Sequence, residues 1–320
     1  MQSLEVTPDD VVLTTTSHSY LGGTSWGLMA LAAGAPLAMA TSPEGAEVFP
    51  LVRSARPTLT WMLPCTLFTL VGEERATRDD FASFRYVSTA GDKAPGELER
   101  RFAELAGYEM VEVYGMTEAI GIAMTPPRGP NKPGSTGPAG AGVALSVRGD
   151  DGTEVPTGEV GRLWIRYRGT MVGYWEHPEA TAEVFSDGWF DTGDLVRVDS
   201  DGFVWFTGRC KQIIVHDGSN IAPQEVEAAL VEHPAVARAG VVGVHDLQHG
   251  ENVWAYVTLR PDVEAPSSSD LIDFAAERVG YKAPEVVEVL DEMPVNAVGK
   301  TDRTVLKRMA AARHDTDVIR

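Results

Sequence analysis

The chain has 320 residues, of which 43% are hydrophobic and 23% are charged, and its formal net charge is −19 at pH 7. That length exceeds the size at which a single core stops growing, so two domains are expected, and the composition is not that of a disordered chain. The acidic balance argues against a nucleic-acid-binding surface, which needs a basic face. The two cysteines, Cys65 and Cys210, are too few for a disulfide framework and lack the spacing of metal ligands.

An apolar run at residues 27–40 ends in Ala-Met-Ala and imitates the core of a secretory signal. A signal needs a positively charged start, whereas the preceding segment contains Glu5, Asp9 and Asp10 and neither Lys nor Arg. The run is also too short to span a bilayer. We therefore expect a buried helix here, no membrane span and a cytoplasmic protein.

Residues 1–125 alternate predicted strands with predicted helices. Short apolar runs indicate the strands, and apolar positions at helical spacing indicate the helices. Strands are expected at 11–13, 36–40, 58–63, 86–87 and 109–114, and helices at about 24–33 and 97–106. This alternation predicts an α/β subdomain with a parallel, doubly wound sheet.

The composition changes at residue 126, and residues 126–208 are rich in Gly and Pro without helical periodicity. Short strands at 143–148, 161–167, 195–198 and 203–206 predict a small β-barrel-like subdomain. Helices return after Gly208, so residues 209–320 are expected to form a compact α+β domain. Its helices are predicted at 223–232, 270–279 and 301–312, and its strands at 239–244, 254–259 and 286–290.

Residues 195–206 alternate apolar and polar side chains around Asp201-Gly202, which is the strongest short signal for a β-hairpin. Asp194 stands at the start of this hairpin and Arg209 just after its end. Antiparallel pairing is expected to bring the two side chains together. A carboxylate can accept hydrogen bonds from both hydroxyls of a ribose, and a guanidinium can add donors to the same sugar. Taken singly, each residue is explained equally well as a turn or strand-end residue.

Three motifs follow one another in this region: Trp-Phe-Asp-Thr-Gly-Asp (189–194), Gly-Arg-x-Lys-x-Ile-Ile (208–214) and Gly-Ser-Asn-Ile-x-Pro-x-Glu-Val-Glu (218–227). In this order they resemble the acyl-adenylate-forming superfamily, which includes acyl-CoA synthetases, peptide-synthetase adenylation domains and luciferases. The resemblance runs from about residue 10 to residue 310. It implies that residues 1–208 are part of a large adenylate-forming domain and that residues 209–320 are a mobile C-terminal domain.

The segment Val-Glu-Val-Tyr-Gly-Met-Thr-Glu (111–118) is similar to another motif of this superfamily. It is expected to be a strand that ends in a turn and a short helical start. The resemblance implies that Tyr114 stacks on adenine, that Thr117 contacts the α-phosphate and that Glu118 helps to hold Mg²⁺. A carboxylate at the C-terminal edge of a strand suits a cation that also bridges phosphates. Without the other motifs, an ordinary strand end would explain these residues as well.

Further positions are implied to border the base and the acyl group. The loop Gly91-Asp92-Lys93 resembles the superfamily loop beside adenine, although Asp92 and Lys93 depart from the usual residues there. His18 matches a position that lines the acyl pocket, and a structural role for a lone His is equally compatible with the sequence. Gly115 stands where acetate-specific relatives carry a bulky Trp. The resemblance therefore implies an open pocket for an acid larger than acetate, with a medium or long chain or an aromatic group.

The C-terminal part carries three further candidates. The segment Pro-Val-Asn-Ala-Val-Gly-Lys-Thr-Asp-Arg (294–303) resembles the closing motif of the superfamily. By this resemblance, Lys300 contacts the acid carboxylate and the α-phosphate and stabilises charge as pyrophosphate leaves. Lys211 falls at the hinge about which the small domain rotates, and Gly218 lets the pantetheine arm pass.

The superfamily's Ser/Thr-Gly-rich phosphate loop, which ends in Lys-Gly, should precede residue 10, and no segment of the 320 residues replaces it. Residues 132–137 (Lys-Pro-Gly-Ser-Thr-Gly) imitate such a loop, but Pro133 and Pro138 remove amide donors and no helix follows. We therefore expect weak or absent ATP–pyrophosphate exchange by this chain alone. We also expect an exposed apolar sheet face that a homo- or hetero-oligomer would cover.

These resemblances predict an acid–thiol ligase of the acyl-CoA synthetase type, with ATP/AMP, Mg²⁺ and CoA as its cofactors. A small carboxylic acid would form acyl-AMP, and CoA would then take the acyl group as a thioester. Two alternatives stay open. One is a non-catalytic half-enzyme that binds adenylate, CoA or a second subunit, although Lys300, Glu118 and Asp194 are retained. The other is a stand-alone adenylation protein that loads a carrier-protein thiol.

Overall fold

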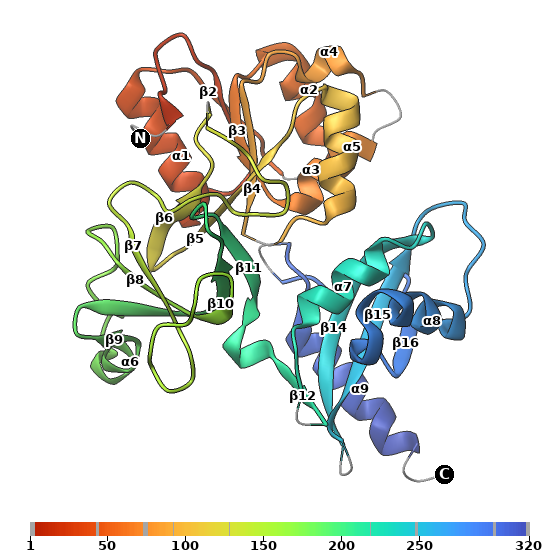
Figure 1. Ribbon diagram of the computed structural model, residues 1–320. Coiled ribbons are helices and arrows are strands. Elements are labelled where there is room, and N and C mark those ends of the chain that lie inside the picture. The colour runs from red at the N-terminus through yellow and green to blue at the C-terminus, as the bar shows by residue number, and fades with distance from the viewer. Residues whose placement is uncertain are drawn as a thin grey trace. The chain divides into compact units, whose positions relative to one another are not determined.

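The protein is described by a computed structural model that covers residues 4–42, 45–72, 76–91, 93–127, 129–217, 219–246, 249–296 and 299–317 (Figure 1). The chain divides into two compact units. The first comprises Met1–Thr192 and Val196–Phe206, and the second comprises Gly193–Leu195 and Thr207–Arg320. Within the described residues, no helix is both long and apolar enough to cross a membrane.

The first unit contains a six-stranded sheet with the order β2-β1-β3-β4-β5-β6. Strands β1 to β5 are parallel, and β6 pairs with β5 in the antiparallel sense. The order 2-1-3-4-5 is that of a doubly wound sheet, so the predicted fold class is confirmed. The strands are β1 Val12–Thr14, β2 Leu37–Met39, β3 Leu59–Met62, β4 Tyr86–Ala90, β5 Val111–Met116 and β6 Ala119–Met124.

Helices cover both faces of this sheet. Neighbouring residues of a strand point to opposite faces, so consecutive apolar residues need a packing partner on each side. Val12 faces a core that includes Met29 and Ala30 of α1, whereas Leu13 faces a core with Leu67 and Phe102 of α3 and α5. Figure 1 shows α1 apart from the group α2, α3 and α5. The helices are α1 Leu21–Ala33, α2 Gly45–Ala55, α3 Pro64–Gly72, α4 Arg78–Phe81 and α5 Gly96–Ala106.

Several local expectations for this unit were wrong. Helices α2 and α3 were missed. The apolar run at 36–40 predicts a buried strand, but β2 is only partly buried, because it is the edge strand and has a neighbour on one side only. The helical start expected after Tyr114 is instead a two-residue turn, Thr117-Glu118, into the antiparallel strand β6. Antiparallel pairing with β5, across a two-residue turn, supplies backbone partners for residues 119–124.

The rest of the first unit is rich in β-structure, as predicted. Its five-stranded sheet has the order β11-β10-β8-β7, with β9 paired to β10. Buried side chains of this sheet, such as Leu163, Phe190 and Val196, pack with Ile122 of β6. The elements are β7 Ala144–Arg148, β8 Val160–Arg166, α6 Pro178–Val184, β9 Phe185–Ser186, β10 Trp189–Val198 and β11 Val204–Arg209.

The second unit is an α+β structure whose sheet has the order β13-β12-β15-β14, with β16 parallel to β15. Val241 faces a core with residues of α7 and α8, and Val242 faces a second core with Leu306 and Ala310 of α9. The elements are the 3₁₀ turns η2 Cys210–Gln212 and η3 Gly280–Lys282, strands β12 Ile214–His216, β13 Ser219–Ile221, β14 Val236–Asp246, β15 Gly250–Leu259 and β16 Val286–Val289, and helices α7 Pro223–Val231, α8 Ser268–Val279 and α9 Arg303–Asp317.

Candidate active site

Asp194 and Arg209 form an ion pair, as the hairpin prediction required. Asp194 lies in β10 and Arg209 ends β11, and Arg209 Nε lies 3.1 Å from Asp194 Oδ1. The carboxylate is 1% exposed, whereas the guanidinium side chain is 51% exposed. The pair thus combines a buried carboxylate, which accepts hydrogen bonds, with a solvent-accessible guanidinium, which donates them. A ribose that bound here would have to share or replace the contact between the two side chains.

The turn of this hairpin is built by Asp199. Its Oδ1 accepts hydrogen bonds from the amides of Asp201 and Phe203, both at 3.0 Å. Lys132 Nζ lies 2.7 Å from Asp199 Oδ2 and 2.6 Å from Asp201 Oδ2. Burial alone would raise the pKa of Asp199, but Lys132 and the donors at the turn lower it well below its usual range. Lys132 therefore stabilises the turn of the hairpin. This agrees with the prediction that residues 132–137 do not form a phosphate-binding loop.

Several predicted site residues lie at the carboxyl edge of the parallel sheet, where open α/β sheets bind ligands. Gly91 follows β4 directly with a φ of 88°, and His18 is exposed in the loop after β1. Tyr114 is buried in β5, and its ring centroid is 6.1 Å from that of Phe206. Thr117 lies exposed in the turn after β5.

Glu118 occupies the same turn and is partly exposed. Tyr174 donates its hydroxyl to Glu118 Oε1 at 3.0 Å, and the amide of Met171 donates to the Glu118 carbonyl at 2.7 Å. Burial and the nearby carboxylate raise the pKa of Tyr174, so this hydroxyl stays a donor at neutral pH. Carboxylate oxygens are the ligands that Mg²⁺ prefers, so Glu118 fits a magnesium site in which Tyr174 orients the carboxylate.

Gly115 has a local backbone role beside the pocket role expected for it. A Cβ atom at this position would lie 2.9 Å from the amide nitrogen of Gly121 and 3.3 Å from the carbonyl oxygen of Ala119. The β5–β6 register shifts between Tyr114 and Met116, as at a bulge, which draws the two strands close there. A side chain at this position would crowd the hairpin unless the strands shift, so glycine here also relieves the close approach of the two strands.

Lys93 forms an ion pair with Glu112 within the first unit. Its Nζ lies 2.8 Å from Glu112 Oε2 and donates to the Gly134 carbonyl at 2.7 Å. Glu112 is 4% exposed and also accepts a hydrogen bond from the amide of Ala94 at 2.8 Å. Burial raises the pKa of Glu112 to about 7, although Lys93 opposes the shift. Any contact between this loop and a base would therefore come from its backbone and not from the Lys93 ammonium.

The remaining candidates lie in the second unit. Lys211 is exposed in η2, next to Gln212, whose side chain accepts a hydrogen bond from Gln224 at 3.1 Å. Lys300 lies between β16 and α9, where its amide donates to Asn296 Oδ1 at 3.1 Å and its carbonyl accepts from the Asn296 amide at 2.8 Å. Asp92 and Gly218 lie outside the described residues.

The family model for AMP-binding enzymes matches residues 1–175, and the model for their C-terminal domain matches residues 225–300. The first match alone spans more than half of the chain. The chain belongs to the AMP-binding enzyme family. The predicted resemblance to adenylate-forming enzymes is thereby confirmed.

Three relatives of this AMP-binding enzyme illustrate the match. The indoleacetate–CoA ligase of Aromatoleum aromaticum is 33% identical over 97% of this chain and 61% of its own length. The fatty acid–[acyl-carrier-protein] ligase ScoC of Streptomyces coeruleorubidus is 31% identical over 93% of this chain and 58% of its own. The ATP-bound crystal structure of MatB from Rhodopseudomonas palustris superposes with a TM-score of 0.90 at 27% identity, covering 96% of this chain and 61% of that one. The chain thus spans about three fifths of the length of these relatives.

Within this AMP-binding enzyme, the structure joins two motifs that the sequence analysis treated separately. Arg303 donates to both carboxylate oxygens of Glu227 at 2.7 Å, and Glu227 Oε1 accepts from the amide of Val241, also at 2.7 Å. Both ionic side chains are largely buried. The contact ties α7 to the start of α9, three residues after Lys300. Both residues end motifs of the superfamily, at 218–227 and 294–303, but their spacing in the sequence does not pair them.

Proposed function

We propose that this chain carries out acid–thiol ligation of the acyl-CoA synthetase type. In the first half-reaction, a carboxylate oxygen attacks the α-phosphate of ATP, giving acyl-AMP and pyrophosphate. In the second, the thiol of CoA loses its proton and attacks the acyl carbon, giving the thioester and AMP. The observation that carries the proposal is the Asp194–Arg209 pair, which unites a buried acceptor and an accessible guanidinium as ribose recognition requires.

The other candidate residues are assigned their roles one by one. Tyr114 would stack on adenine, Thr117 would contact the α-phosphate, and Glu118, oriented by Tyr174, would hold Mg²⁺. The ion would neutralise charge on the phosphates. Lys300 would act on the acid carboxylate and the α-phosphate, and its loop is braced by Asn296. Gly218 would border the pantetheine arm of CoA.

We propose an acid larger than acetate, because Gly115 has no side chain and His18 presents an exposed imidazole at the positions assigned to the acyl pocket. Indole-3-acetate is the first acid to test, since a relative matched over nearly the whole chain is named for it. A carrier-protein thiol is the second candidate acceptor, favoured by the similarity to ScoC.

The test separates the two half-reactions. The 320-residue chain is mixed with synthetic indole-3-acetyl-AMP and CoA, and thioester is followed by mass spectrometry, with acetyl-AMP as the size control. We expect thioester from the indoleacetyl adenylate above the uncatalysed rate and less from acetyl-AMP. ATP–pyrophosphate exchange is measured in parallel and is expected to be weak. Thioester on a phosphopantetheinylated carrier protein but not on CoA would favour the second candidate, and no thioester on either would refute the ligase proposal.

A hinge at Lys211 gives a further prediction. Lys211→Pro fixes φ and removes an amide donor within η2, so a backbone rotation needed between the half-reactions should be blocked. Thioester formation from acyl-AMP is expected to fall at least about tenfold while AMP binding, measured by calorimetry, is retained. Lys211→Ala is the matched control, because it removes the side chain and leaves the backbone free. Equal rates for the proline variant and the control would place the hinge elsewhere.

A further inference from the structure

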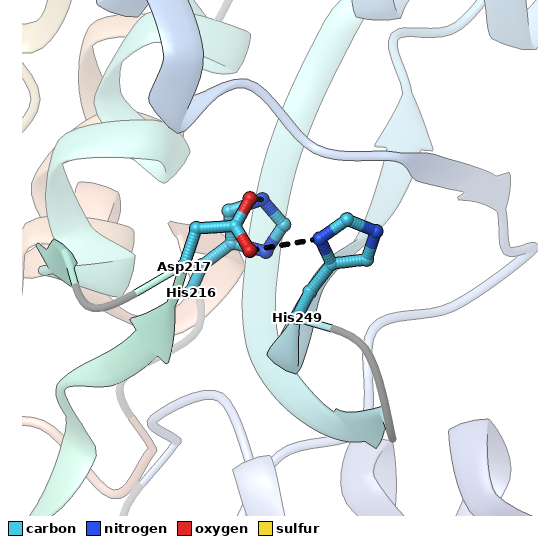
Figure 2. Close-up of side chains that lie close together, drawn as sticks. All are labelled: His216, Asp217 and His249. Atoms are coloured by element: carbon cyan, nitrogen blue, oxygen red, sulfur yellow. Dashed lines mark hydrogen bonds and ion pairs between the residues drawn. The ribbon is translucent and has the colours of Figure 1, made fainter.

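Two histidines and an aspartate meet on one side of the second unit, outside the proposed ligase site. His216 ends β12, Asp217 follows it, and His249 precedes β15 (Figure 2). One potential ligand atom from each side chain lies within 4.8 Å of the others. Figure 2 shows the Asp217 carboxylate in front of the His216 ring, with an interaction drawn from the carboxylate to the His249 ring. The rings are stacked, with centroids 5.2 Å apart and an angle of 19° between their planes.

The orientation of His216 resembles that of a metal-ligating histidine. Its Nδ1 lies 2.7 Å from the carbonyl oxygen of Glu251, so this nitrogen carries the proton in the neutral ring and donates. The unprotonated Nε2 then faces the carboxylates. A backbone carbonyl on the distal nitrogen is the usual second partner of a histidine ligand, because it fixes the tautomer and the ring orientation. His216 is 12% exposed, which further restricts its rotation.

The spacing of the potential ligands suits a small divalent ion. Nε2 of His216 lies 3.6 Å from Asp217 Oδ2 and 3.3 Å from Glu285 Oε1, and Nδ1 of His249 lies 2.9 Å from Asp217 Oδ1. Zn²⁺ with bonds of about 2.0–2.1 Å places tetrahedral ligand atoms about 3.3 Å apart. These three separations bracket that value. His249, whose ring stacks on that of His216, would have to rotate to point its nitrogen at an ion shared with His216.

We propose that these three side chains and the neighbouring Glu285 carboxylate bind a divalent transition-metal ion such as Zn²⁺. Two imidazoles with carboxylates form a donor set that suits zinc and related ions better than Mg²⁺ or Ca²⁺, which prefer oxygen alone. The ion would replace the hydrogen bond between His249 and Asp217, so the proton on His249 Nδ1 would leave on binding. It would link the end of β12, the start of β15 and the residue before β16.

The experiment uses the full chain without a histidine tag, stripped with a chelator and titrated with ZnCl₂ alone in a calorimeter. We expect saturable single-site binding. Since loss of an outer partner of a ligand weakens metal binding by about 10–100-fold, loss of a ligand should weaken it by at least about 100-fold. His216→Ala and His249→Ala should each show this loss. His177→Ala is the matched control, because His177 is an exposed histidine of the first unit and should leave zinc affinity unchanged.

A second readout keeps the proposal testable if His216→Ala folds poorly. Co²⁺ replaces Zn²⁺ in such sites, and a tetrahedral ion with nitrogen and oxygen ligands absorbs visible light far more strongly than the hydrated ion. We expect this absorption in the wild-type chain and its loss in His249→Ala, which changes a partly exposed residue. Equal zinc affinity in the wild type and both variants, no saturable binding, or only the weak absorption of an octahedral ion would overturn the proposal. None of these outcomes depends on ligase activity.

Discussion

Lys93→Met should destabilise the first unit more at pH 8 than at pH 5.5, and the extra cost at pH 8 should reach about 1 kcal/mol, because the wild-type carboxyl is ionised there. Breaking a buried ion pair from one side leaves an uncompensated charge, which is costly in proportion to the ionised fraction of the partner. Glu112 is that partner, and its carboxyl is almost completely buried. Urea unfolding followed by tryptophan fluorescence at the two pH values measures the difference.

The direction of the pH effect follows from the raised pKa of Glu112. Burial raises this pKa from 4.5 to about 7 in the folded protein, so the folded state binds the proton more tightly than the unfolded chain. The stability that this group contributes is therefore full below about pH 4.5 and is lost as the pH rises through about 7. Removal of Lys93 takes away the opposing cation, which raises the pKa further and steepens the loss at alkaline pH.

Two variants test this explanation. The double variant Lys93→Met, Glu112→Gln removes the charge while an amide oxygen can still accept from Ala94, so most of the lost stability should return. Arg100→Met is the matched control, because Arg100 pairs with Glu97 and Glu104 at the surface, where solvent screens ion pairs, and its loss should change the stability little at either pH. A pH-independent loss in Lys93→Met, or no recovery in the double variant, would show that Lys93 stabilises the unit by packing and not through Glu112.

Asp194→Ala should weaken the binding of AMP by about 1.5–3 kcal/mol, the contribution of hydrogen bonds to a charged group. This corresponds to a dissociation constant about 10–150-fold higher. The variant should still fold, because the Arg209 side chain left without its partner is half exposed and can be hydrated. Isothermal titration of AMP into the folded variant measures the change.

The same hairpin supplies the control for this prediction. Asp201 lies in the turn with its side chain 67% exposed, so Asp201→Ala changes an acidic residue of the hairpin without touching the proposed ribose site. Its AMP affinity should equal that of the wild type. Asp194→Asn should fall between the wild type and the alanine variant, because an amide oxygen accepts hydrogen bonds without the charge. An AMP affinity unchanged in Asp194→Ala would refute ribose binding by this pair.

The sequence predicted the elements whose signals are local. The alternation around Asp201-Gly202 predicted the hairpin, and the hairpin in turn predicted that Asp194 and Arg209 meet. The alternation of strands and helices predicted a doubly wound sheet, whose order 2-1-3-4-5 the structure confirms. Signals of this kind arise from the periodicity of side chains along a strand or helix, so they are readable without knowledge of distant contacts.

Backbone pairing and side-chain contacts decided the features that the sequence pattern did not predict. The turn after Tyr114 continues as β6 and not as a helix, since β5 supplies its backbone partners. The sequence placed Lys93 in a loop expected to border adenine. In the structure its ammonium is bound by the buried carboxylate of Glu112, nineteen residues later.

The sequence by itself therefore determined the family of this protein and the local course of its chain, through motifs in order and side-chain period. Only the tertiary structure decided which charged groups from different motifs meet. Glu227 contacts Arg303, 76 residues away in the sequence. Asp217, which follows His216, contacts His249, 32 residues away. The physical reason is that burial makes an unpaired charge costly, so the partner is chosen by which side chains the packed sheets bring within reach.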